Sequence, residues 1–318
     1  MPDYAYFNRQ IVPISEARIG IMTHALHYGT ACFEGIRGIW NSNEGQMYLF
    51  RVRDHYERLR KSCHIMKIGF PYDIDELCKV TVELVQTSGY SKDVYVRPLA
   101  YKSAQVVGVR MHEVEDDFFM FVTPFGPYLD LDRGARCCIS SWRRVDDTMI
   151  PARAKVTGIY VNSAIAKTEA YENGYDEAIF LNQDGHVSEG SGENLFMVVE
   201  GKLVTPSPSD NILVGITRDC IALLAREELG IETVERQIDR SELYIADEVF
   251  LTGTAAHVTP VVEIDHRNIG DGMVGEITKK LQTLYFDVIK GNNPKYAYWC
   301  TPAYRQPVQT HRTRISTS

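Results

Sequence analysis

A segment at residues 123–133, interrupted by two prolines and one glycine, divides the chain into two parts with different patterns. Proline and glycine break both helices and strands, so we expect a domain boundary here. With 318 residues, the chain is long enough for about two domains of ordinary size. We predict an N-terminal domain at 1–123, an interdomain loop at 124–133 and a C-terminal domain at 134–300. Residues 301–318 are polar and contain no acidic side chain, and we expect a loose tail there.

Helices and strands are mixed in the first part, whereas strands dominate the second. The segments with strand composition in the first part are 4–7, 45–50, 94–99 and 118–122. Helical periodicity there marks 53–66 and 73–87, the latter with Asp73 as a candidate N-cap. The second part is predicted to contain hairpins at 177–189 and 194–205, and helices at 159–173 and 217–229 that each end at a glycine. The pattern predicts an α+β fold, with a smaller α/β domain followed by a larger, strand-rich domain.

Composition argues against several classes of protein. A formal net charge of −8 argues against a nucleic-acid-binding protein, which would present a basic surface. No basic start followed by an apolar stretch opens the chain, and no apolar run approaches the roughly 18 residues of a membrane span. We therefore expect a cytoplasmic protein with no membrane partner.

Cysteine and histidine give no metal or disulfide pattern. The seven cysteines show no C-x-x-C spacing, so we expect reduced residues of the core. The nine histidines include no H-E-x-x-H, and we predict no metal site.

Lys155 is the candidate catalytic lysine. Only a neutral amine attacks a carbonyl, so such a lysine must be reachable and partly desolvated. Its neighbours Ala154, Val156 and Gly158 are small or apolar and permit close approach by a planar ring. The ordinary alternative is a solvated surface lysine, which is how we interpret Lys167, because acidic residues lie near it in a predicted helix.

A carboxylate and two turns complete a pattern typical of a pyridoxal phosphate site. Glu189 lies between a short strand and two glycines, where it can face a pyridine nitrogen, although a turn glutamate on the surface is the alternative. The sequence Gly215-Ile216-Thr217 opens a predicted helix, whose free amides and dipole suit a phosphate, although a simple N-cap is the commoner role. A second hydroxyl-and-amide turn occurs at 252–254.

Three further residues are candidate anion ligands. Arg58 lies in an arginine-rich helix from which one side chain can reach a phosphate, but periodicity does not say which. Tyr95 and Arg97 are two residues apart in a strand and therefore share a face. If Arg97 is buried on this face, its guanidinium needs an anionic partner, which is either a substrate carboxylate or an acidic side chain of the protein itself.

These segments, together with His24-Ala25-Leu26-His27-Tyr28-Gly29-Thr30 and Phe33-Glu34-Gly35-Ile36-Arg37, resemble the branched-chain aminotransferases of the fold type IV pyridoxal phosphate enzymes. The resemblance runs from about residue 7 to residue 299 and rests on several separated motifs in one order. It implies the two-domain architecture of the D-amino-acid aminotransferase type. It also implies that Lys155 binds the cofactor covalently, and that the other cofactor contacts are Arg58, Tyr160, Glu189, Leu213, Ile216, Thr217 and Thr254.

The same resemblance implies the substrates. The α-carboxylate would meet Tyr95 and the amides of Ala255 and Ala256, while Arg97 and Tyr28 would take the distal carboxylate of glutamate or 2-oxoglutarate. The remaining implied substrate contacts are Phe33, Gly35, Arg37, Tyr160 and Val109, some of them from a neighbouring subunit. The expected reaction is ping-pong transamination of leucine, isoleucine or valine with 2-oxoglutarate through pyridoxamine phosphate, carried out by at least a homodimer.

Two positions depart from the family pattern. Val214 stands where proline is common, and His257 stands where glutamate is frequent. Both lie close enough to the expected pocket to alter its shape.

Several alternatives remain open. D-amino-acid transaminases, R-selective amine transaminases and aminodeoxychorismate lyases share the lysine and the glutamate, although the Tyr95-x-Arg97-Pro98 strand and the 33–37 segment favour the branched-chain group. A different class, a Rossmann-type binding module or a scaffolding protein, lacks support because no G-x-G-x-x-G follows a predicted strand.

Overall fold

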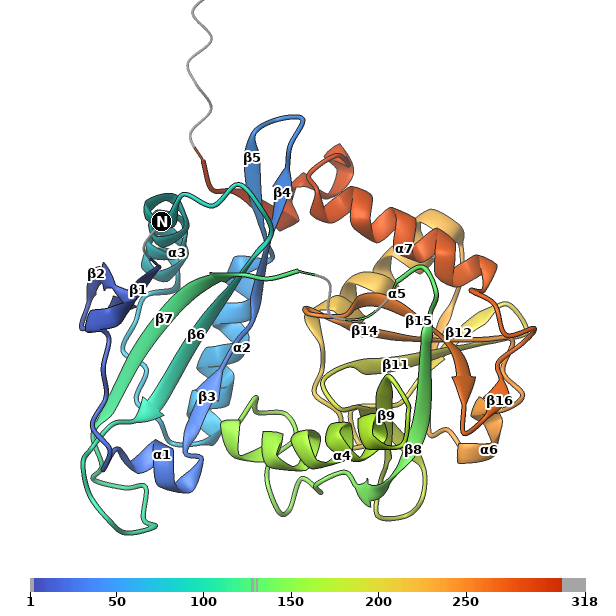
Figure 1. The fold of residues 1–318 in the computed structure, drawn as a ribbon, viewed down its shortest axis with the longest axis horizontal. Coiled ribbons are helices and arrows are strands. Elements are labelled where there is room, and N and C mark those ends of the chain that lie inside the picture. The colour runs from blue at the N-terminus through green and yellow to red at the C-terminus, as the bar shows by residue number, and fades with distance from the viewer. Residues whose placement is uncertain (1–2, 127–128, 130, 305–318) are drawn as a thin grey trace, which may run out of the picture.

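The computed structural model describes residues 3–126, 129 and 131–304, which form two domains side by side (Figure 1). Each domain is built on its own β-sheet, the first mainly from residues before 125 and the second from residues after 134. The predicted mixed α and β architecture is therefore confirmed.

The N-terminal sheet has strand order β17-β5-β4-β6-β7-β1-β2, with β3 paired to β6, and all its pairings are antiparallel. Its strands are β1 (Tyr4–Phe7), β2 (Gln10–Pro13), β3 (Ala31–Phe33), β4 (Ile36–Asn41), β5 (Gln46–Phe50), β6 (Val94–Lys102), β7 (Asp116–Pro124) and β17 (Cys300–Pro302). Its helices are η1 (Ile14–Glu16), α1 (His24–Tyr28), α2 (Val52–Ile65) and α3 (Ile74–Ser88).

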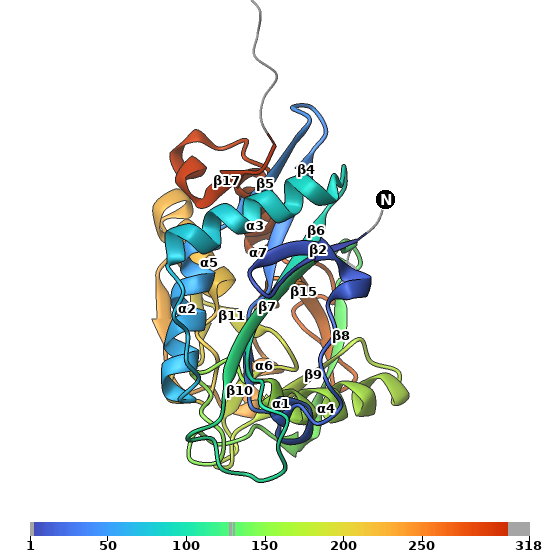
Figure 2. The same ribbon diagram turned by 90° about the vertical axis from the view of Figure 1, so that its left-hand side faces the viewer.

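Helices α2 and α3 cover one face of this sheet (Figure 2). The start and end of α3 follow from local sequence. Asp73 Oδ1 accepts a hydrogen bond from the Glu76 amide at 2.9 Å, and Gly89 ends the helix in the left-handed conformation. The buried side chains Leu77, Leu84 and Val85 face the sheet, as the helical period predicts.

The C-terminal sheet has strand order β10-β9-β8-β15-β14-β11-β12-β13, with β16 paired to β15. Its strands are β8 (Ala135–Arg143), β9 (Glu177–Leu181), β10 (Val187–Gly190), β11 (Asn194–Val199), β12 (Lys202–Thr205), β13 (Thr233–Glu235), β14 (Glu248–Gly253), β15 (His257–Ile264) and β16 (Arg267–Asn268). Its helices are η2 (Thr157–Ile159), α4 (Tyr160–Glu172), α5 (Ile216–Leu229), α6 (Arg240–Leu243), α7 (Glu276–Ile289) and η3 (Pro294–Trp299). Helices α5 and α7 pack on β14 and β15, whereas α4 packs on β8 and β9.

The end of the chain differs from the expectation of a loose tail from residue 301. Strand β17 pairs with β5 of the first sheet, with Thr301 opposite Leu49, and Ala303 is buried. The expectation was wrong for 301–304, because pairing with a distant strand leaves no local signal in a polar segment. Residues 305–318 lie outside the described residues. Within the described chain, no helix combines the length and apolar character required to traverse a bilayer.

Candidate active site

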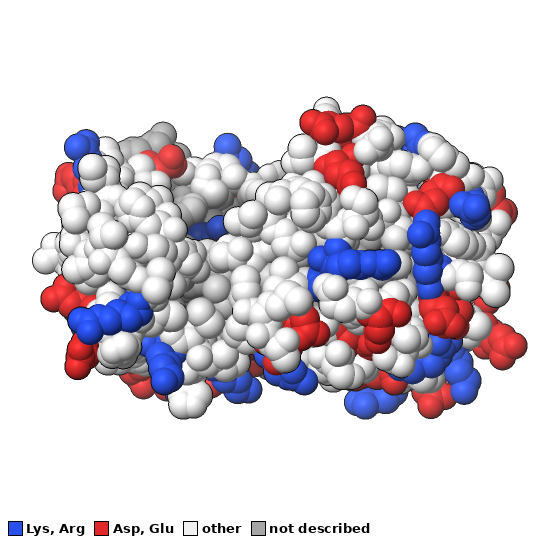
Figure 3. Space-filling view, turned by 90° about the horizontal axis from the view of Figure 1, so that it is seen from below, with Lys and Arg blue, Asp and Glu red and all other residues white. Residues whose placement is uncertain are grey.

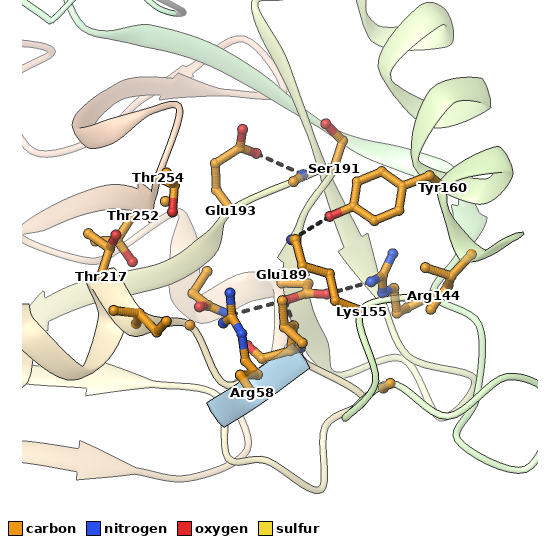
Figure 4. Close-up of a pocket in the computed structure, with 18 of the residues that line it drawn as sticks. Arg58, Arg144, Lys155, Tyr160, Glu189, Ser191, Glu193, Thr217, Thr252 and Thr254 are labelled. Carbon is orange, nitrogen blue, oxygen red and sulfur yellow. Dashed lines mark hydrogen bonds and ion pairs between the residues drawn. The ribbon is translucent and has the colours of Figure 1, made fainter. Parts of the chain in front are cut away.

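One cavity between the domains brings together all eight residues expected to contact a cofactor: Arg58, Lys155, Tyr160, Glu189, Leu213, Ile216, Thr217 and Thr254. It encloses about 560 Å³ of empty space, part of which opens to solvent. Figure 4 shows that its walls come from separate parts of the chain, with α2 on one side and the strands and turns of the C-terminal sheet on the other. The sequence segments that carry the motifs therefore meet at one place.

Lys155 is held in an extended segment just before η2. Its carbonyl accepts a hydrogen bond from the Phe33 amide at 3.0 Å, and its own amide donates to Ser62 Oγ at 3.2 Å. These contacts fix the backbone against β3 and α2. The side chain points into the cavity, where Nζ donates to Tyr160 Oη at 2.7 Å (Figure 4).

Glu189 is a buried carboxylate with a full set of partners. Arg144 Nη2 lies 2.6 Å from Oε1, while Asn194 Nδ2 and the Leu213 amide donate to Oε2 at 3.0 and 3.1 Å. Burial raises the pKa of Glu189, and the Arg144 guanidinium is the main influence that opposes this shift. A buried ionised group needs a partner of opposite charge. Arg144 is that partner and stabilises the charged form of Glu189 at the cavity wall.

The start of α5 forms an anion-binding corner. Gly215 is the N-cap residue and has no side chain to occupy the amides of Ile216 and Thr217, which leaves them free for a ligand. A Cβ atom at Gly215 would lie 2.1 Å from Asn194 Oδ1, so any other residue here would displace the Asn194 side chain, which donates to Glu189 and to the Leu213 carbonyl. Nearby, the buried Thr252 Oγ1 has no hydrogen-bond partner among the described residues. A phosphate would suit these donors.

Arg58 reaches this corner from α2, held by an acid between β3 and β4. Its Nε and Nη2 donate to Glu34 at 2.6 and 2.8 Å, and its Nη1 donates to the Val214 carbonyl at 3.0 Å. His55 Nδ1 also lies 2.7 Å from Glu34. Burial alone would raise the pKa of Glu34, but Arg58 and His55 outweigh it and lower the pKa well below its usual value. Glu34 therefore remains charged and fixes the orientation of Arg58.

The substrate residues expected on β3, β4 and β6 are not among the described residues that line this cavity, although the Phe33 ring centre lies 5.0 Å from Lys155 Nζ. Arg97 Nη2 donates to Tyr95 Oη at 3.0 Å, and the Arg97 guanidinium carbon lies 4.5 Å from the centre of the Phe33 ring. The Tyr95 side chain lies against Gly35, since a Cβ atom added to Gly35 would be 1.9 Å from the Tyr95 hydroxyl. Tyr95 is also the cross-strand partner of Arg37 in the pairing of β6 with β4.

An apolar side and a turn complete this region. The Phe33 and Tyr160 rings are 4.9 Å apart, with their planes at 62°. Ala255 and Ala256 follow Thr254 in the turn between β14 and β15. Of these residues, Tyr160 lines the cavity together with Arg58 and Arg144, whereas Phe33, Arg97, Ala255 and Ala256 do not.

Val109 does not line the cavity of its own chain. It is 79% exposed, in a loop whose Gly108 amide donates to Tyr28 Oη at 3.0 Å. The contribution of some substrate contacts by a neighbouring subunit stays a prediction.

Residues 31–264 match the protein family described as Amino-transferase class IV. The chain belongs to this family. A relative named a probable branched-chain-amino-acid aminotransferase, from Aquifex aeolicus, is 51% identical over 302 residues, covering 95% of this chain and 97% of the relative. These matches confirm the resemblance to branched-chain aminotransferases.

Solved structures of branched-chain aminotransferases have the same fold. The enzyme of Thermobaculum terrenum in its PLP-form aligns with a TM-score of 0.91 at 40% identity, covering 96% of this chain and 99% of that one. A second solved enzyme, from T.th., complexed with N-(5'-phosphopyridoxyl)-L-glutamate, aligns with a TM-score of 0.90 at 38% identity, covering 96% and 99%. The fold type IV architecture of this aminotransferase is thereby confirmed.

The sequence did not point to several residues of the aminotransferase site. Arg144, Asn194 and the Glu34–His55 pair all border the cavity or hold a residue that does. For Asn194 a local signal existed, because it lies only five residues after Glu189, to which its side chain donates a hydrogen bond. Nothing in the Trp142-Arg143-Arg144 run distinguishes the buried arginine from its exposed neighbour.

The interpretation of Lys167 as a surface charge was wrong. The side chain is only 28% exposed, and its Nζ pairs with the fully buried Glu177 and donates to the Asp176 carbonyl. The nearby acids in the sequence, Glu169 and Glu172, suggested local pairing along the helix, whereas the partner comes from β9.

Proposed function

We propose that this aminotransferase transfers amino groups between branched-chain L-amino acids and 2-oxoglutarate, using pyridoxal 5'-phosphate bound covalently to Lys155. The proposal rests on three groups that line one cavity. They are the hydrogen-bonded Lys155 and Tyr160, the buried carboxylate of Glu189, and the free amides at the start of α5. The names of the related proteins support the substrate class.

The residues at the cavity fit the cofactor. Free amides at Ile216 and Thr217, the unpaired Thr252 hydroxyl and Arg58 suit a phosphate carrying about −1.5 to −2 charges. Glu189 would face the ring nitrogen, Tyr160 would bond the phenolic oxygen, and Leu213 would pack on the ring. Thr254 would add a hydroxyl to the phosphate.

When bound, the cofactor supplies the aldehyde that carries the amino group and the ring that accepts electron density. Lys155 would then act at its Nζ, which would take the proton from the substrate α-carbon and hold it for return. Tyr160 Oη, 2.7 Å from Nζ, orients the amine. The Arg144–Glu189 pair would keep a charged carboxylate available to the ring nitrogen.

The substrate pocket must accept both an apolar side chain and a second carboxylate. Phe33 and Tyr160 provide an aromatic wall, and Arg97 stands beside it with Tyr95 as its partner. We assign the α-carboxylate to Tyr95 and the Ala255 and Ala256 amides, and the distal carboxylate to Arg97 and Tyr28. The relative bound to a phosphopyridoxyl-glutamate adduct supports a site that admits the second carboxylate.

We also propose a homodimer, on the basis of an exposed apolar patch around α1. The exposed side chains of the patch are Ile19, Ile21, Met22, Leu26, Val106, Val107 and Val109. A hydrogen bond from the Gly108 amide to Tyr28 ties the loop to α1. In Figure 3, seen from below, uncharged residues cover much of the side where α1 lies. Docking a second copy here would bring Val109 and Tyr28 towards its pocket.

Replacing Arg97 with alanine should weaken the 2-oxoglutarate half-reaction by at least about tenfold more than the leucine half-reaction. The guanidinium is the distal-carboxylate ligand, whereas leucine has no distal carboxylate. Single-turnover absorbance changes would measure the two half-reactions separately. Equal losses in both would remove Arg97 from this role.

The proposed function predicts a yellow protein with a visible absorption band that borohydride removes, because reduction fixes the cofactor on Lys155. Mass analysis of the reduced protein should place the adduct on the peptide that contains Lys155. A panel of L-leucine, D-alanine and R-1-phenylethylamine, each with 2-oxoglutarate, should show the highest turnover with L-leucine. A colourless protein after incubation with pyridoxal phosphate would reject the cofactor, and a preference for either other donor would reject the substrate class.

A further inference from the structure

A second carboxylate, that of Glu193, lines the same cavity as Glu189 and has no role in the proposed function. The residue is 4% exposed and lies in the turn between β10 and β11. Its Oε2 accepts one hydrogen bond, at 3.0 Å, from the amide of Gly192 (Figure 4). Among the described residues, no side chain donates to either carboxylate oxygen, and no basic residue forms an ion pair with it.

The other three buried glutamates of the described chain all have basic partners. These pairs are Glu34 with Arg58 and His55, Glu177 with Lys167, and Glu189 with Arg144. A carboxylate that is buried and ionised without such a partner is strongly destabilising, so an unpaired one normally takes up a proton. The contacts of Glu193 are therefore those of a neutral acid, in contrast to the contacts of Glu189.

Glycines make room for the Glu193 side chain at the cavity wall. A Cβ atom added to Gly190 would lie 2.8 Å from Oε2, and one added to Gly253 would lie 3.5 Å from Cγ. The carboxyl group therefore occupies space that two neighbouring strands, β10 and β14, leave open by having no side chain at these positions.

The charged groups around Glu193 act in the same direction as its burial. Burial raises the pKa of Glu193 to about 8, and the nearby carboxylates of Glu177 on β9 and Glu189 on β10 add to this shift, while Lys167 on α4 opposes it. Cys137 on β8 is a neutral thiol, because burial raises its own pKa. The other titratable residues that line the cavity form no hydrogen bond or ion pair with Glu193: Arg58, Arg144, Lys155 and Tyr160.

We propose that Glu193 is a specificity-determining residue, whose protonated carboxyl group lets the cavity accept carboxylate ligands and whose ionisation in alkaline solution weakens their binding. An ionised Glu193 would place a second negative charge in a wall that anionic groups must approach, and like charges repel strongly where water is excluded. The inference rests on the proposed function for the identity of the ligands. The protonation of Glu193 does not depend on it.

The protonation is tested by infrared spectroscopy of Glu193→Gln, which keeps the size of the side chain and removes the acidic proton. The wild-type-minus-variant difference spectrum should show the C=O band of a carboxylic acid at about pH 7, and this band should fade as the pH rises through about 8. Glu83→Gln is the control, since Glu83 is exposed on α3 and should give no such band. A difference spectrum without the band at about pH 7 would overturn the proposal.

Thermal stability gives a second measure of the same proton. In the unfolded chain a glutamate ionises near pH 4.3, whereas Glu193 in the folded protein keeps its proton to about pH 8. The unfolded state therefore binds fewer protons between these pH values, and wild type should lose stability relative to Glu193→Gln across this range. The gap in melting temperature should widen from about pH 5 to about pH 8 and stay constant above it. A gap that does not change with pH contradicts the proposal.

Ligand binding is tested with 4-methylvalerate, a branched carboxylate, and the cofactor-loaded protein, with the visible band as the readout. If only the protonated form binds, the wild-type dissociation constant should rise about tenfold more between about pH 7 and about pH 9 than that of Glu193→Gln. Other groups titrate in both proteins and cancel in this comparison. Glu193→Ala also lacks the charge and replaces Glu193→Gln in every measurement if the latter does not fold.

The two proposals fail in different ways. Parallel pH dependence of 4-methylvalerate binding in wild type and variant, with a normal visible band, would reject only the role of Glu193. A wild-type protein without the visible band would reject the proposed function, and with it the ligands assigned to Glu193.

Discussion

Replacing Lys155 with alanine should abolish transamination, lowering turnover with leucine by at least about four orders of magnitude. The side chain is the only lysine amine that lines the described part of the cavity, and it is assigned both the covalent bond to the cofactor and the movement of the substrate α-proton. Tyr160, its hydrogen-bond partner, would be left without the amine that it orients.

The variant should also lose the borohydride-reducible adduct, as judged by mass analysis, while still folding, because the Lys155 side chain points into a cavity and forms no part of the packed core. Lys61→Ala is a suitable control, since Lys61 is exposed on α2 and should leave turnover and the adduct unchanged. A Lys155→Ala protein with a normal adduct would end the assignment.

Replacing Glu189 with glutamine should lower turnover by about 10²- to 10³-fold. The carboxylate is assigned to the cofactor ring nitrogen, and a neutral amide no longer favours a proton there. The same change leaves Arg144 buried at 5% exposure without its counter-ion, which costs about 3–5 kcal/mol of the free energy of unfolding.

The two effects can be separated with the double variant Glu189→Gln, Arg144→Gln. Removing both charges should restore most of the free energy of unfolding, measured by denaturant titration of the cofactor-free protein, because no unpaired ion remains. Turnover should stay low, since the carboxylate is still missing. If the double variant regains wild-type turnover, Glu189 acts only on Arg144 and has no role at the cofactor.

Local sequence was sufficient to predict the helices and hairpins that carry their own signals. Helix α3 begins after Asp73 and ends at Gly89, and α5 ends at Gly230, because caps act within one turn of the residue that forms them. Strands β8 and β15 and helix α7 were not predicted. The structure of these segments depends on pairing and packing with distant parts of the chain, and such contacts leave little hydrophobic periodicity in a short sequence window.

The residues of the candidate site fall into the same two groups, those with a local sequence signal and those without one. The motif residues that contact a cofactor in the family were found because they lie in short, ordered segments, and all of them line one cavity. Arg144 and Glu34 were missed because their importance comes from a partner on another element, Glu189 for the first and Arg58 for the second. A buried ion pair between distant segments cannot be inferred from either residue alone.

The return of β17 to the first sheet links the order of synthesis to the order of folding. The Ala303 amide donates to the Met47 carbonyl at 2.8 Å, and the Gln46 side chain donates to the Tyr304 carbonyl at 2.8 Å. The N-terminal sheet thus obtains its edge strand from residues that leave the ribosome long after the rest of the sheet. Until then β5 presents an open edge, so the first domain completes its folding only after the second has been made.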